Sequence, residues 1–348
     1  MSFLFSNCKP LKTTYPTFYD AFTRAMKHAD EFDIAVGYVS EDSLAELQRL
    51  VELNEIRRLG LTIGMHYIEK FTKAQYNAAI QLNRFLKSNH CGEVRLVTPF
   101  RFHGKLYLAS SNSQPFAAII GSNNLSSIIN DNNKIYEASV LLTDSQSTSG
   151  MAQFISQLNH DATRVIDECS IDGFAESNPV LGGQEGVEKA KPSEIAAAMA
   201  ALTDVSFDIP IKTEPKSNLN AFFGKGREGK NGLVVPRHWY EAELIVPSTI
   251  TCKPGYPQAQ TESAIFDVIT DDGFKFKCKV SGDYSKNLRS EGDLKILGRW
   301  LKGRMESAGA LTTGEPVTEQ VLQNYGRSTF TLTKTRIQNL WFLNFEVK

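Results

Sequence analysis

The sequence of 348 residues predicts two domains of different class, an α/β domain followed by an all-β domain. A chain of this length can bury two separate cores. Helical and strand patterns alternate as far as residue 172, whereas short strands and turns prevail from residue 209. Residues 173–208 are polar and rich in glycine and proline, which predicts a linker. The alternating pattern of residues 1–172 predicts a mostly parallel sheet flanked by helices.

The elements of the first domain follow from hydrophobic periodicity. Apolar residues at helical spacing, among them Phe18, Phe22 and Met26, predict the first helix. Ser43 is expected to cap the second helix, because Glu46 three residues later completes a capping box. The expected helices are 18–31, 43–59, 72–86 and 151–166, and the expected strands are 32–39, 61–65, 93–98, 105–109, 116–120 and 137–142.

The second half is predicted to be a barrel or sandwich of short strands. Turn residues separate apolar runs at regular spacing, which is typical of all-β domains. A short alanine-rich helix, 193–202, is expected within the linker, and 318–324 is the one helix expected beyond it. The expected strands are 241–246, 264–270, 273–280, 295–300, 329–335 and 340–347.

The composition is that of an ordinary globular protein and argues against several classes of protein: disulfide-rich, zinc-binding, secreted and membrane proteins. Apolar residues make up 41% of the chain and charged residues 22%. Because the cysteines are odd in number and scattered, neither a disulfide framework nor a zinc site is expected. These cysteines are Cys8, Cys91, Cys169, Cys252 and Cys278. No stretch has the pattern of a signal peptide or the length of a membrane span, so a cytoplasmic protein is expected.

Charge is distributed unevenly between the two halves. The net charge is −1 overall, but residues 1–204 hold 18 basic and 23 acidic side chains. Residues 205–348 hold 20 basic and 16 acidic side chains. The second half is therefore the part favoured to meet a polyanion such as a nucleic acid.

Two polar runs at the ends of neighbouring predicted strands carry the chemical signal. In the first, residues 101–108, His103 and Lys105 are two positions apart and project to the same face of an extended chain. In the second, residues 119–125, a Gly-Ser-Asn-Asn turn can bring more hydrogen-bonding groups beside them. One imidazole, one cation and neutral donors suit an anionic substrate such as a phosphate.

Each of these signals alone also has a structural explanation. A single histidine near a strand is most often a core residue, and a Gly-Ser-Asn-Asn run is most often a turn. Lys105 favours function, because a lysine on the same strand face must reach an anion or solvent. The ordered combination on adjacent strands favours a phosphodiesterase site.

The pair of runs resembles the His-x-Lys and Gly-Ser-x-Asn signature of the phospholipase D superfamily. The resemblance implies that His103 is the nucleophile and forms a phosphohistidine. It assigns Lys105 and Asn124 to the charge on the non-bridging oxygens, with Ser122 as a supporting donor. Asn123 remains the alternative to Asn124, because a one-residue bulge would exchange them.

The resemblance also implies a carboxylate partner for the histidine, and the candidate here is Glu137. Such a partner fixes the imidazole tautomer and supports the imidazolium, although a solvated strand-end acid is the alternative. The superfamily has an aspartate four or five residues after its lysine, where this chain has Ala109 and Ser110. This departure fits the nuclease branch better than the lipid hydrolases.

The chain carries one copy of the motif, whereas the chemistry uses one histidine to attack and another to protonate the leaving oxygen. The resemblance therefore implies a homodimer formed through residues 1–172, with both copies of His103 in one active site. It implies neither a metal ion nor a cofactor.

The second half interleaves cations, asparagine and aromatic residues in its predicted loops, which suits phosphate and base contacts. Trp239 and Trp300 are expected to be core residues, and the cations could equally be a solubilising surface. Behind the first domain, the pattern resembles the recognition domain of restriction endonucleases that share the plant B3 fold. That fold is an open barrel that grips the major groove with two arms, here residues 224–237 and 282–289 with 302–304. The implied DNA contacts are Arg227, Arg237, Lys286, Asn287, Arg289, Lys302 and Arg304.

The whole chain thus resembles site-specific restriction endonucleases of the BfiI and NgoFVII type. The resemblance implies double-stranded DNA as substrate, a companion methyltransferase and, in some relatives, a helicase-like ATPase subunit. The alternatives are a phospholipase or phosphatidyltransferase, and a DNA-binding protein with an inactive nuclease core. The single motif and the basic second half argue against the first alternative. The joint presence of His103, Lys105, Asn124 and Glu137 argues against the second.

Overall fold

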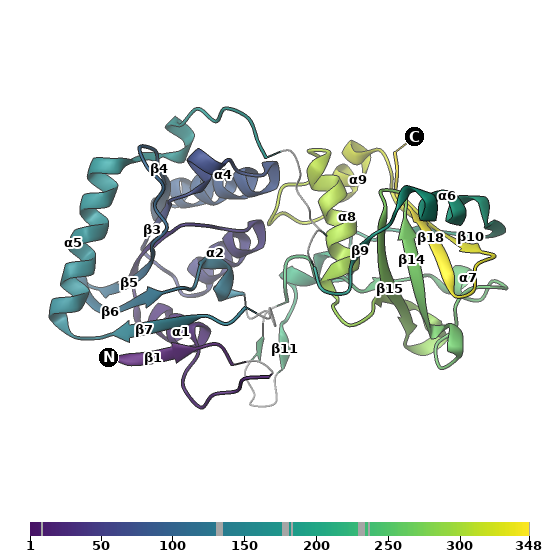
Figure 1. Cartoon of the computed structure of the whole chain (residues 1–348), viewed down its shortest axis with the longest axis horizontal. Coiled ribbons are helices and arrows are strands. Elements are labelled where there is room, and N and C mark those ends of the chain that lie inside the picture. The colour runs from purple at the N-terminus through teal and green to yellow at the C-terminus, as the bar shows by residue number, and fades with distance from the viewer. Residues whose placement is uncertain are drawn as a thin grey trace. The chain divides into compact units, whose positions relative to one another are not determined.

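A computed structural model describes residues 1–7, 10–129, 135–175, 181, 184–228, 234–235 and 237–347. The chain divides into two compact units, Met1–Asn178 and Pro179–Lys348 (Figure 1). Within the described residues, none of the helices combines the length and the apolar character that crossing a membrane requires.

The N-terminal unit is built on one sheet with helices on both of its faces. Its strands are β1 Ser2–Phe5, β2 Glu31–Val36, β3 Arg58–Ile63, β4 Gly92–Val97, β5 Lys105–Ser111, β6 Gln114–Gly121, β7 Ala138–Leu142 and β8 Thr163–Val165. Its helices are α1 Phe18–His28, α2 Glu41–Leu53, α3 His66–Glu69, α4 Lys73–Ser88 and α5 Ser145–Ala162. The strand order is β1-β7-β6-β5-β2-β3-β4-β8.

This sheet is mixed, and the prediction of a mostly parallel sheet is wrong. Among the described strands, β2–β3 and β3–β4 are the parallel pairs, and the others are antiparallel. β5 and β6 are joined by Asn112 and Ser113, whose φ angles are 49° and 60°. Two such residues make a tight hairpin turn, whereas a parallel pair needs a crossover of about a dozen residues or more.

Helices cover the two faces of the sheet through separate apolar cores. Ile34 and Tyr107 point into the larger core with residues of α1, α2 and α4. Their chain neighbours Ala35 and Leu106 point to the other face, where Met151 of α5 packs. This alternation is the two-residue period of strands. Figure 1 accordingly shows α5 on the opposite side of the sheet from α2 and α4.

Helix starts agree with the sequence in part. Thr17 and Thr72 cap α1 and α4 through capping boxes. The predicted cap at Ser43 is wrong, because α2 begins at Glu41 and Ser40 is its N-cap residue. Glu46, which had suggested the later start, instead accepts a hydrogen bond of 2.8 Å from Arg49 Nε.

The C-terminal unit is built on an open sheet. Its strands are β9 Glu188–Lys189, β10 Leu202–Pro210, β11 Arg227–Glu228, β12 Val234–Val235, β13 Leu244–Ile245, β14 Ile265–Thr270, β15 Phe274–Ser281, β16 Asn287–Ser290, β17 Thr329–Thr335 and β18 Leu340–Asn344. The order is β10-β17-β18-β14-β15-β16-β13, with β9 beside β15 and with β11 and β12 forming a separate pair. In the described part of this path, β10 and β13 each have one neighbour, so the sheet does not close on itself. An open barrel was predicted.

Three features of this unit differ from the sequence prediction. Residues 188–208 were expected in the linker, but β9 and most of β10 lie in this range and belong to the sheet, and α6, Pro192–Ala200, lies between them. The expected strand 295–300 is instead the start of a helix, α8, Lys295–Ser307. The unit is therefore not purely β: it also contains α7, Ser248–Thr251, and α9, Glu319–Tyr325. The α9 helix was predicted.

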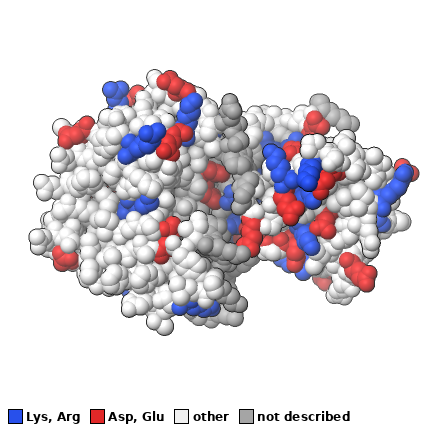
Figure 2. All heavy atoms as spheres, in the orientation of Figure 1, with Lys and Arg blue, Asp and Glu red and all other residues white. Residues whose placement is uncertain are grey.

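The buried aromatic residues of the C-terminal unit form its interior. Trp239 and Trp300 are each 1% exposed, which confirms that they are core residues. On the face seen in Figure 2, lysine and arginine side chains of this unit lie among aspartates and glutamates. The modest positive excess of the sequence is therefore not gathered into one uniform patch on this face.

Candidate active site and DNA-contact residues

The fold brings both polar runs to the same end of the N-terminal sheet. Lys105 at the start of β5 pairs with Val36 at the end of β2. Gly121 at the end of β6 pairs with Ser139 of β7. His103 therefore comes immediately before β5, and the segment Ser122–Asn124 comes immediately after β6. Both lie at the same end of the strands.

Two glycines let the His103 segment approach the ends of β2 and β3. A Cβ atom on Gly37 would lie 2.8 Å from Cδ2 of His103. A Cβ atom on Gly64 would lie 1.9 Å from the carbonyl oxygen of Phe102, and the Phe102 amide donates to the Gly64 carbonyl at 3.0 Å. The close approach requires glycine at both positions.

Lys105 is buried beside the histidine. Its side chain points into the sheet end with 8% of the residue exposed, and Nζ donates to the His103 carbonyl oxygen at 2.9 Å. Burial lowers the pKa of Lys105, and the nearby Glu137 carboxylate acts in the opposite direction. The structure thus brings a histidine, a lysine and a carboxylate into one neighbourhood.

The two asparagines after β6 have different environments. Asn123 is 5% exposed, its Nδ2 donates to Ser127 Oγ at 3.1 Å, and its Oδ1 accepts from Ser139 Oγ at 2.5 Å. Asn124 is half-buried, and its Oδ1 accepts from the Tyr38 amide at 3.3 Å. Among the described residues, Nδ2 of Asn124 has no hydrogen-bond partner, so Asn124 is the asparagine with donors left for a ligand.

Ser122 and Glu137 occupy the mouth of this region. The Ser122 hydroxyl donates to the Ala138 carbonyl at 3.3 Å and accepts from the Ala138 amide at 3.0 Å. Glu137 is half-buried and is fixed through its backbone, which exchanges hydrogen bonds with Ser6. Within the described part of this single chain, its carboxylate makes no hydrogen bond to His103.

The proposed arms of the C-terminal unit hold their cations in different ways. Arg237 forms an ion pair with Glu241, and its side chain is 24% exposed. Lys286 and Arg289 are half-buried at β16, which lies between β15 and β13. Arg227 belongs to β11, but its side chain lies outside the described atoms.

Two of the predicted DNA contacts are held inside the fold. Lys302 is 0% exposed, its Nζ donates to the Trp239 carbonyl at 2.5 Å, and it lies 3.7 Å from the centre of the Trp239 ring. A fully buried ammonium cannot reach a phosphate, so its assignment as a DNA contact is wrong. Arg304, whose side chain is 20% exposed, pairs with Asp271 and also lies 5.8 Å from the centre of the buried Trp300 ring, so we remove it from the contact set as well.

The segment after the first arm is fixed to α8 by a buried polar network. Glu306 accepts from Trp239 Nε1 at 3.2 Å and from the Tyr240 hydroxyl at 2.8 Å. Arg299 lies over the Tyr240 ring at 4.7 Å. Burial lowers the pKa of Lys302 to about 7, although Glu306 opposes the shift. Lys302 therefore acts as an anchor for Trp239 and not as a surface cation.

Two protein-family models match this chain, one in each unit. Residues 16–170 match the NgoFVII restriction endonuclease N-terminal PLD domain. Residues 197–336 match the NgoFVII C-terminal B3-like DNA-binding domain. The chain belongs to the NgoFVII family of restriction endonucleases. Of the three functions considered from the sequence, family membership favours the endonuclease.

Solved structures resemble part of this NgoFVII-family chain. Phosphatidylserine synthase from Haemophilus influenzae Rd KW20 is 14% identical with a TM-score of 0.36, and the match covers 49% of this chain and 41% of the synthase. Nuc, a phospholipase D family member from Salmonella typhimurium, is 13% identical with a TM-score of 0.28, and the match covers 41% of this chain and 86% of Nuc. No curated protein matches the chain.

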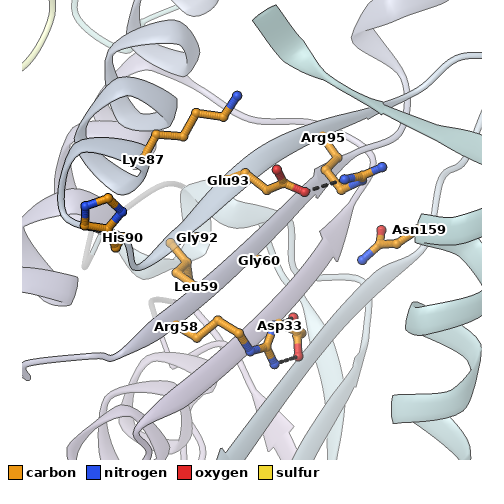
Figure 3. A pocket seen from close by; sticks show the side chains of 10 residues that line it. All are labelled: Asp33, Arg58, Leu59, Gly60, Lys87, His90, Gly92, Glu93, Arg95 and Asn159. Atoms are coloured by element: carbon orange, nitrogen blue, oxygen red, sulfur yellow. Dashed lines mark hydrogen bonds and ion pairs between the residues drawn. The ribbon is translucent and has the colours of Figure 1, made fainter. Parts of the chain in front are cut away.

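A hollow of about 490 Å³ lies at the other ends of β2, β3 and β4 in this NgoFVII-family chain (Figure 3). Its cations are already paired: Arg58 binds Asp33 at 2.7 Å, Arg95 binds Glu93, and Lys87 binds Asp167 outside the lining at 2.9 Å. The hollow contains none of the motif residues. Across the described residues, no group of three or more His, Cys, Asp and Glu side chains is arranged to hold a metal ion.

Sequence reasoning missed a cluster beside His103. Tyr38 lies edge-on to the His103 ring, with 5.4 Å between ring centres, and its hydroxyl donates to Glu69 Oε2 at 2.7 Å. Glu69 also pairs with Arg101, at 3.3 Å. Gly37-Tyr38 directly after a buried strand was a usable signal, because this end of β2 meets the start of β5.

Proposed function

We propose that this endonuclease cleaves DNA site-specifically through a covalent phosphohistidine, without a metal ion, in one active site built by a homodimer. The observation that carries the proposal is the grouping of His103, Lys105 and Asn124 at one end of the sheet. These groups supply a nucleophile, a buried cation and free amide donors.

The reaction takes two balanced steps. A ring nitrogen of His103 attacks phosphorus and forms a P–N bond, while the P–O bond to the leaving strand breaks. The leaving oxygen takes a proton from the imidazolium of His103 in the second copy. That imidazole then removes a proton from water, whose oxygen attacks phosphorus, and the P–N bond breaks to release His103.

The surrounding groups stabilise charge in these steps. Lys105 and the free Nδ2 of Asn124 would bind the non-bridging oxygens, and Ser122 supplies a further donor at the mouth. Glu137, whose charge is felt by Lys105, would support the imidazolium when the dimer assembles. Asn123, whose amide is engaged on both sides, supports the turn.

A row of apolar side chains on the sheet is suited to form the interface with the second copy of the chain. Phe3 pairs with Val140, and Val140 pairs with Ile120, so the three side chains share one face across β1, β7 and β6. Phe3 is 49% exposed and Ile120 is 44% exposed. Ile120 directly precedes Gly121, at the active end of the sheet. Burying this row against itself would bring two catalytic ends together.

Recognition of the DNA sequence is assigned to the B3-like domain. We propose Arg227, Arg237, Lys286, Asn287 and Arg289 as its contacts. The loop before β16 contains left-handed residues, Gly282 with φ of 74° and Tyr284 with φ of 57°. Tyr284 is 79% exposed, so this loop projects from the sheet, as a groove-binding arm requires.

Cleavage of long duplex DNA in excess EDTA tests the proposal. The wild-type enzyme should give discrete fragments, and a neutral-pH denaturing gel should detect a covalent complex with end-labelled DNA. His103→Ala should give neither, because the nucleophile is removed. Cleavage by His103→Ala, or strict dependence of the wild type on Mg²⁺, would contradict the chemistry.

Mixed dimers and one surface variant test the assembly. A dimer with one His103→Ala subunit should be inactive or severely slowed. Ile120→Glu should produce monomers by sedimentation and lose cleavage, whereas Ile337→Glu, at a similarly exposed isoleucine (43%) of the other unit, should do neither. A dimeric Ile120→Glu protein would exclude this interface.

A further inference from the structure

We propose that Tyr38 is a positioning residue that fixes both the His103 imidazole and the Asn124 carboxamide for DNA cleavage. The inference rests on the proposed role of His103 as nucleophile. Tyr38 follows Gly37 at the end of β2 and is half-buried. Among the described residues, Tyr38 contacts both groups, the imidazole through its ring and the Asn124 carboxamide through its backbone N–H.

Tyr38 contacts the two groups with different parts of the residue. Its ring meets the His103 ring edge-on, at 5.4 Å between centres and an interplanar angle of 80°. Its backbone N–H donates to Asn124 Oδ1 at 3.3 Å. An N–H donor requires the oxygen of the amide, so this bond turns Nδ2 of Asn124 away from Tyr38 and leaves both of its hydrogens for a ligand.

The Tyr38 ring is itself held from two sides. Its hydroxyl donates to Glu69 Oε2 at 2.7 Å, and this hydrogen bond raises the pKa of Tyr38, so the phenol stays protonated. The ring also meets His66 edge-on at 5.5 Å. His66 stacks on Phe71 at 4.7 Å and accepts the Val39 amide through Nε2 at 3.2 Å.

His66 gives this support without competing as a second nucleophile. It is 6% exposed, and burial lowers its pKa, so the ring stays neutral. One nitrogen is occupied by the Val39 amide, and the other lies 3.5 Å from the Lys70 carbonyl oxygen. The successive ring contacts from Phe71 through His66 to Tyr38 therefore connect His103 to the packed core.

His103 needs such support because its side chain is exposed and precedes β5. Gly37 leaves room for one face of the imidazole, and Tyr38 closes the neighbouring direction. An imidazole that turns freely spends little time aligned with phosphorus, and misplacement by about 1 Å can cost about 100-fold in rate. Tyr38 acts through His103 and Asn124 and has no part in bond making.

Three variants test this role. Tyr38→Leu removes the ring contacts, Tyr38→Phe keeps them and removes the hydroxyl, and Tyr19→Leu is the matched control. Tyr19 is another half-buried tyrosine of the same unit and lies on α1, outside the row of rings that leads to His103. Single-turnover cleavage at saturating DNA in EDTA, the Kd for DNA and the thermal midpoint are measured for each.

Tyr38→Leu should lower the single-turnover rate about 10- to 100-fold with an unchanged Kd. Tyr38→Phe should stay within about threefold of the wild type, and Tyr19→Leu should cleave normally. Two results together distinguish a positioning role from a general effect on stability. Tyr38→Leu changes the single-turnover rate without changing the Kd, and phenylalanine at this position restores the rate. A Tyr38→Leu enzyme that cleaves within threefold of the wild type overturns the inference and leaves the function of His103 intact.

A second measurement decides the question where Tyr38→Leu fails to fold. Glu69→Ala and Tyr38→Phe remove the same hydrogen bond, so each should slow cleavage by the same small factor, about threefold at most, and the double variant should be slowed no further. Arg101→Ala controls for the other partner of Glu69. Additive losses in the double variant contradict the inference, whereas cleavage by His103→Ala would instead contradict the proposed function.

Discussion

The N-terminal and C-terminal units each bury a lysine that was expected from the sequence to bind the substrate, Lys105 as a catalytic residue and Lys302 as a DNA contact. Lys105 lies at the end of a strand, 8% exposed, with Nζ on the His103 carbonyl. Lys302 lies within α8, 0% exposed, with Nζ on the Trp239 carbonyl and its charge over the indole ring. The Lys105 ammonium lies at the end of a strand, beside the loops of the candidate site, and the Lys302 ammonium is enclosed by protein.

The contrast shows that the element around a lysine decides what its charge can do. A strand end leaves a side chain facing the loops of the site, whereas the inner face of a packed helix leaves it facing the core. Burial lowers the pKa of both lysines, and a nearby carboxylate opposes the shift in each case, Glu137 at Lys105 and Glu306 at Lys302. We therefore propose that Lys105 stabilises a phosphate, whereas Lys302 holds a tryptophan.

Replacing each lysine by methionine should separate the two roles most strongly. Lys105→Met should lower single-turnover cleavage about 100- to 1,000-fold, because one preorganised cation on the transition state is lost. Lys302→Met should cleave within a fewfold of the wild type at saturating DNA. Equal losses in both variants, with both proteins folded, would break the comparison.

Lys302 should instead contribute to the pH dependence of the free energy of unfolding. Its pKa in the folded protein is about 7, below the ordinary value of 10.5, so the unfolded chain binds more protons between these values. Stability from this group therefore rises with pH across that window. Urea unfolding at pH 7 and at pH 9 should show a smaller rise in Lys302→Met than in the wild type. An unchanged difference would mean that Lys302 is not the titrating group.

With Lys302 inside the fold, DNA contacts must come from other cations, and Arg289 is the sharpest test. A bidentate base contact should cost about 1–3 kcal/mol on Arg289→Ala and relax preference at one position. A phosphate contact should weaken all sequences alike and reduce the salt slope by about 1. Competition binding on a randomised duplex library distinguishes them, with Arg304→Ala as the paired-arginine control. Unaltered affinity and preference for Arg289→Ala would remove it from the contact set.

Glu137 gives the finest test of the Lys105 environment. Because its negative charge favours the protonated lysine, Glu137→Gln should lower the pKa of Lys105 further. The alkaline limb of the pH–rate profile should then move to lower pH, whatever the loss in maximal rate. A limb that stays in place would separate Glu137 from Lys105.

The sequence predicted the elements of the N-terminal unit better than their directions. Helical and strand periods report burial, and they located β2, β5, β6 and α4 within a few residues. They carry no information on strand direction, which the two-residue turn at Asn112 and Ser113 decides. The strand expected at 295–300 failed for a related reason, because a short apolar run fits a strand or a buried helix equally well.

The candidate site was predictable where residues close in the chain form it. His103 and Lys105 share one short segment, and their spacing alone indicated a common site. Tyr38 and Glu69 were missed, because only the pairing of β2 with β5 and β3 brings them beside His103. Lys302 was misassigned because a cationic residue in an apolar run gives no sign of which helix face it occupies.

Gly64 carries a consequence for how mutations distribute over this protein. Any side chain there would need the space of the Phe102 carbonyl, a backbone atom that cannot turn aside. A random mutagenesis screen for inactive enzyme should therefore return Gly64 substitutions alongside those of the reacting groups, although Gly64 offers the substrate no functional group. The positions in this protein that tolerate no substitution would then include Gly64, where the backbone passes Phe102 next to the histidine, as well as the residues that react.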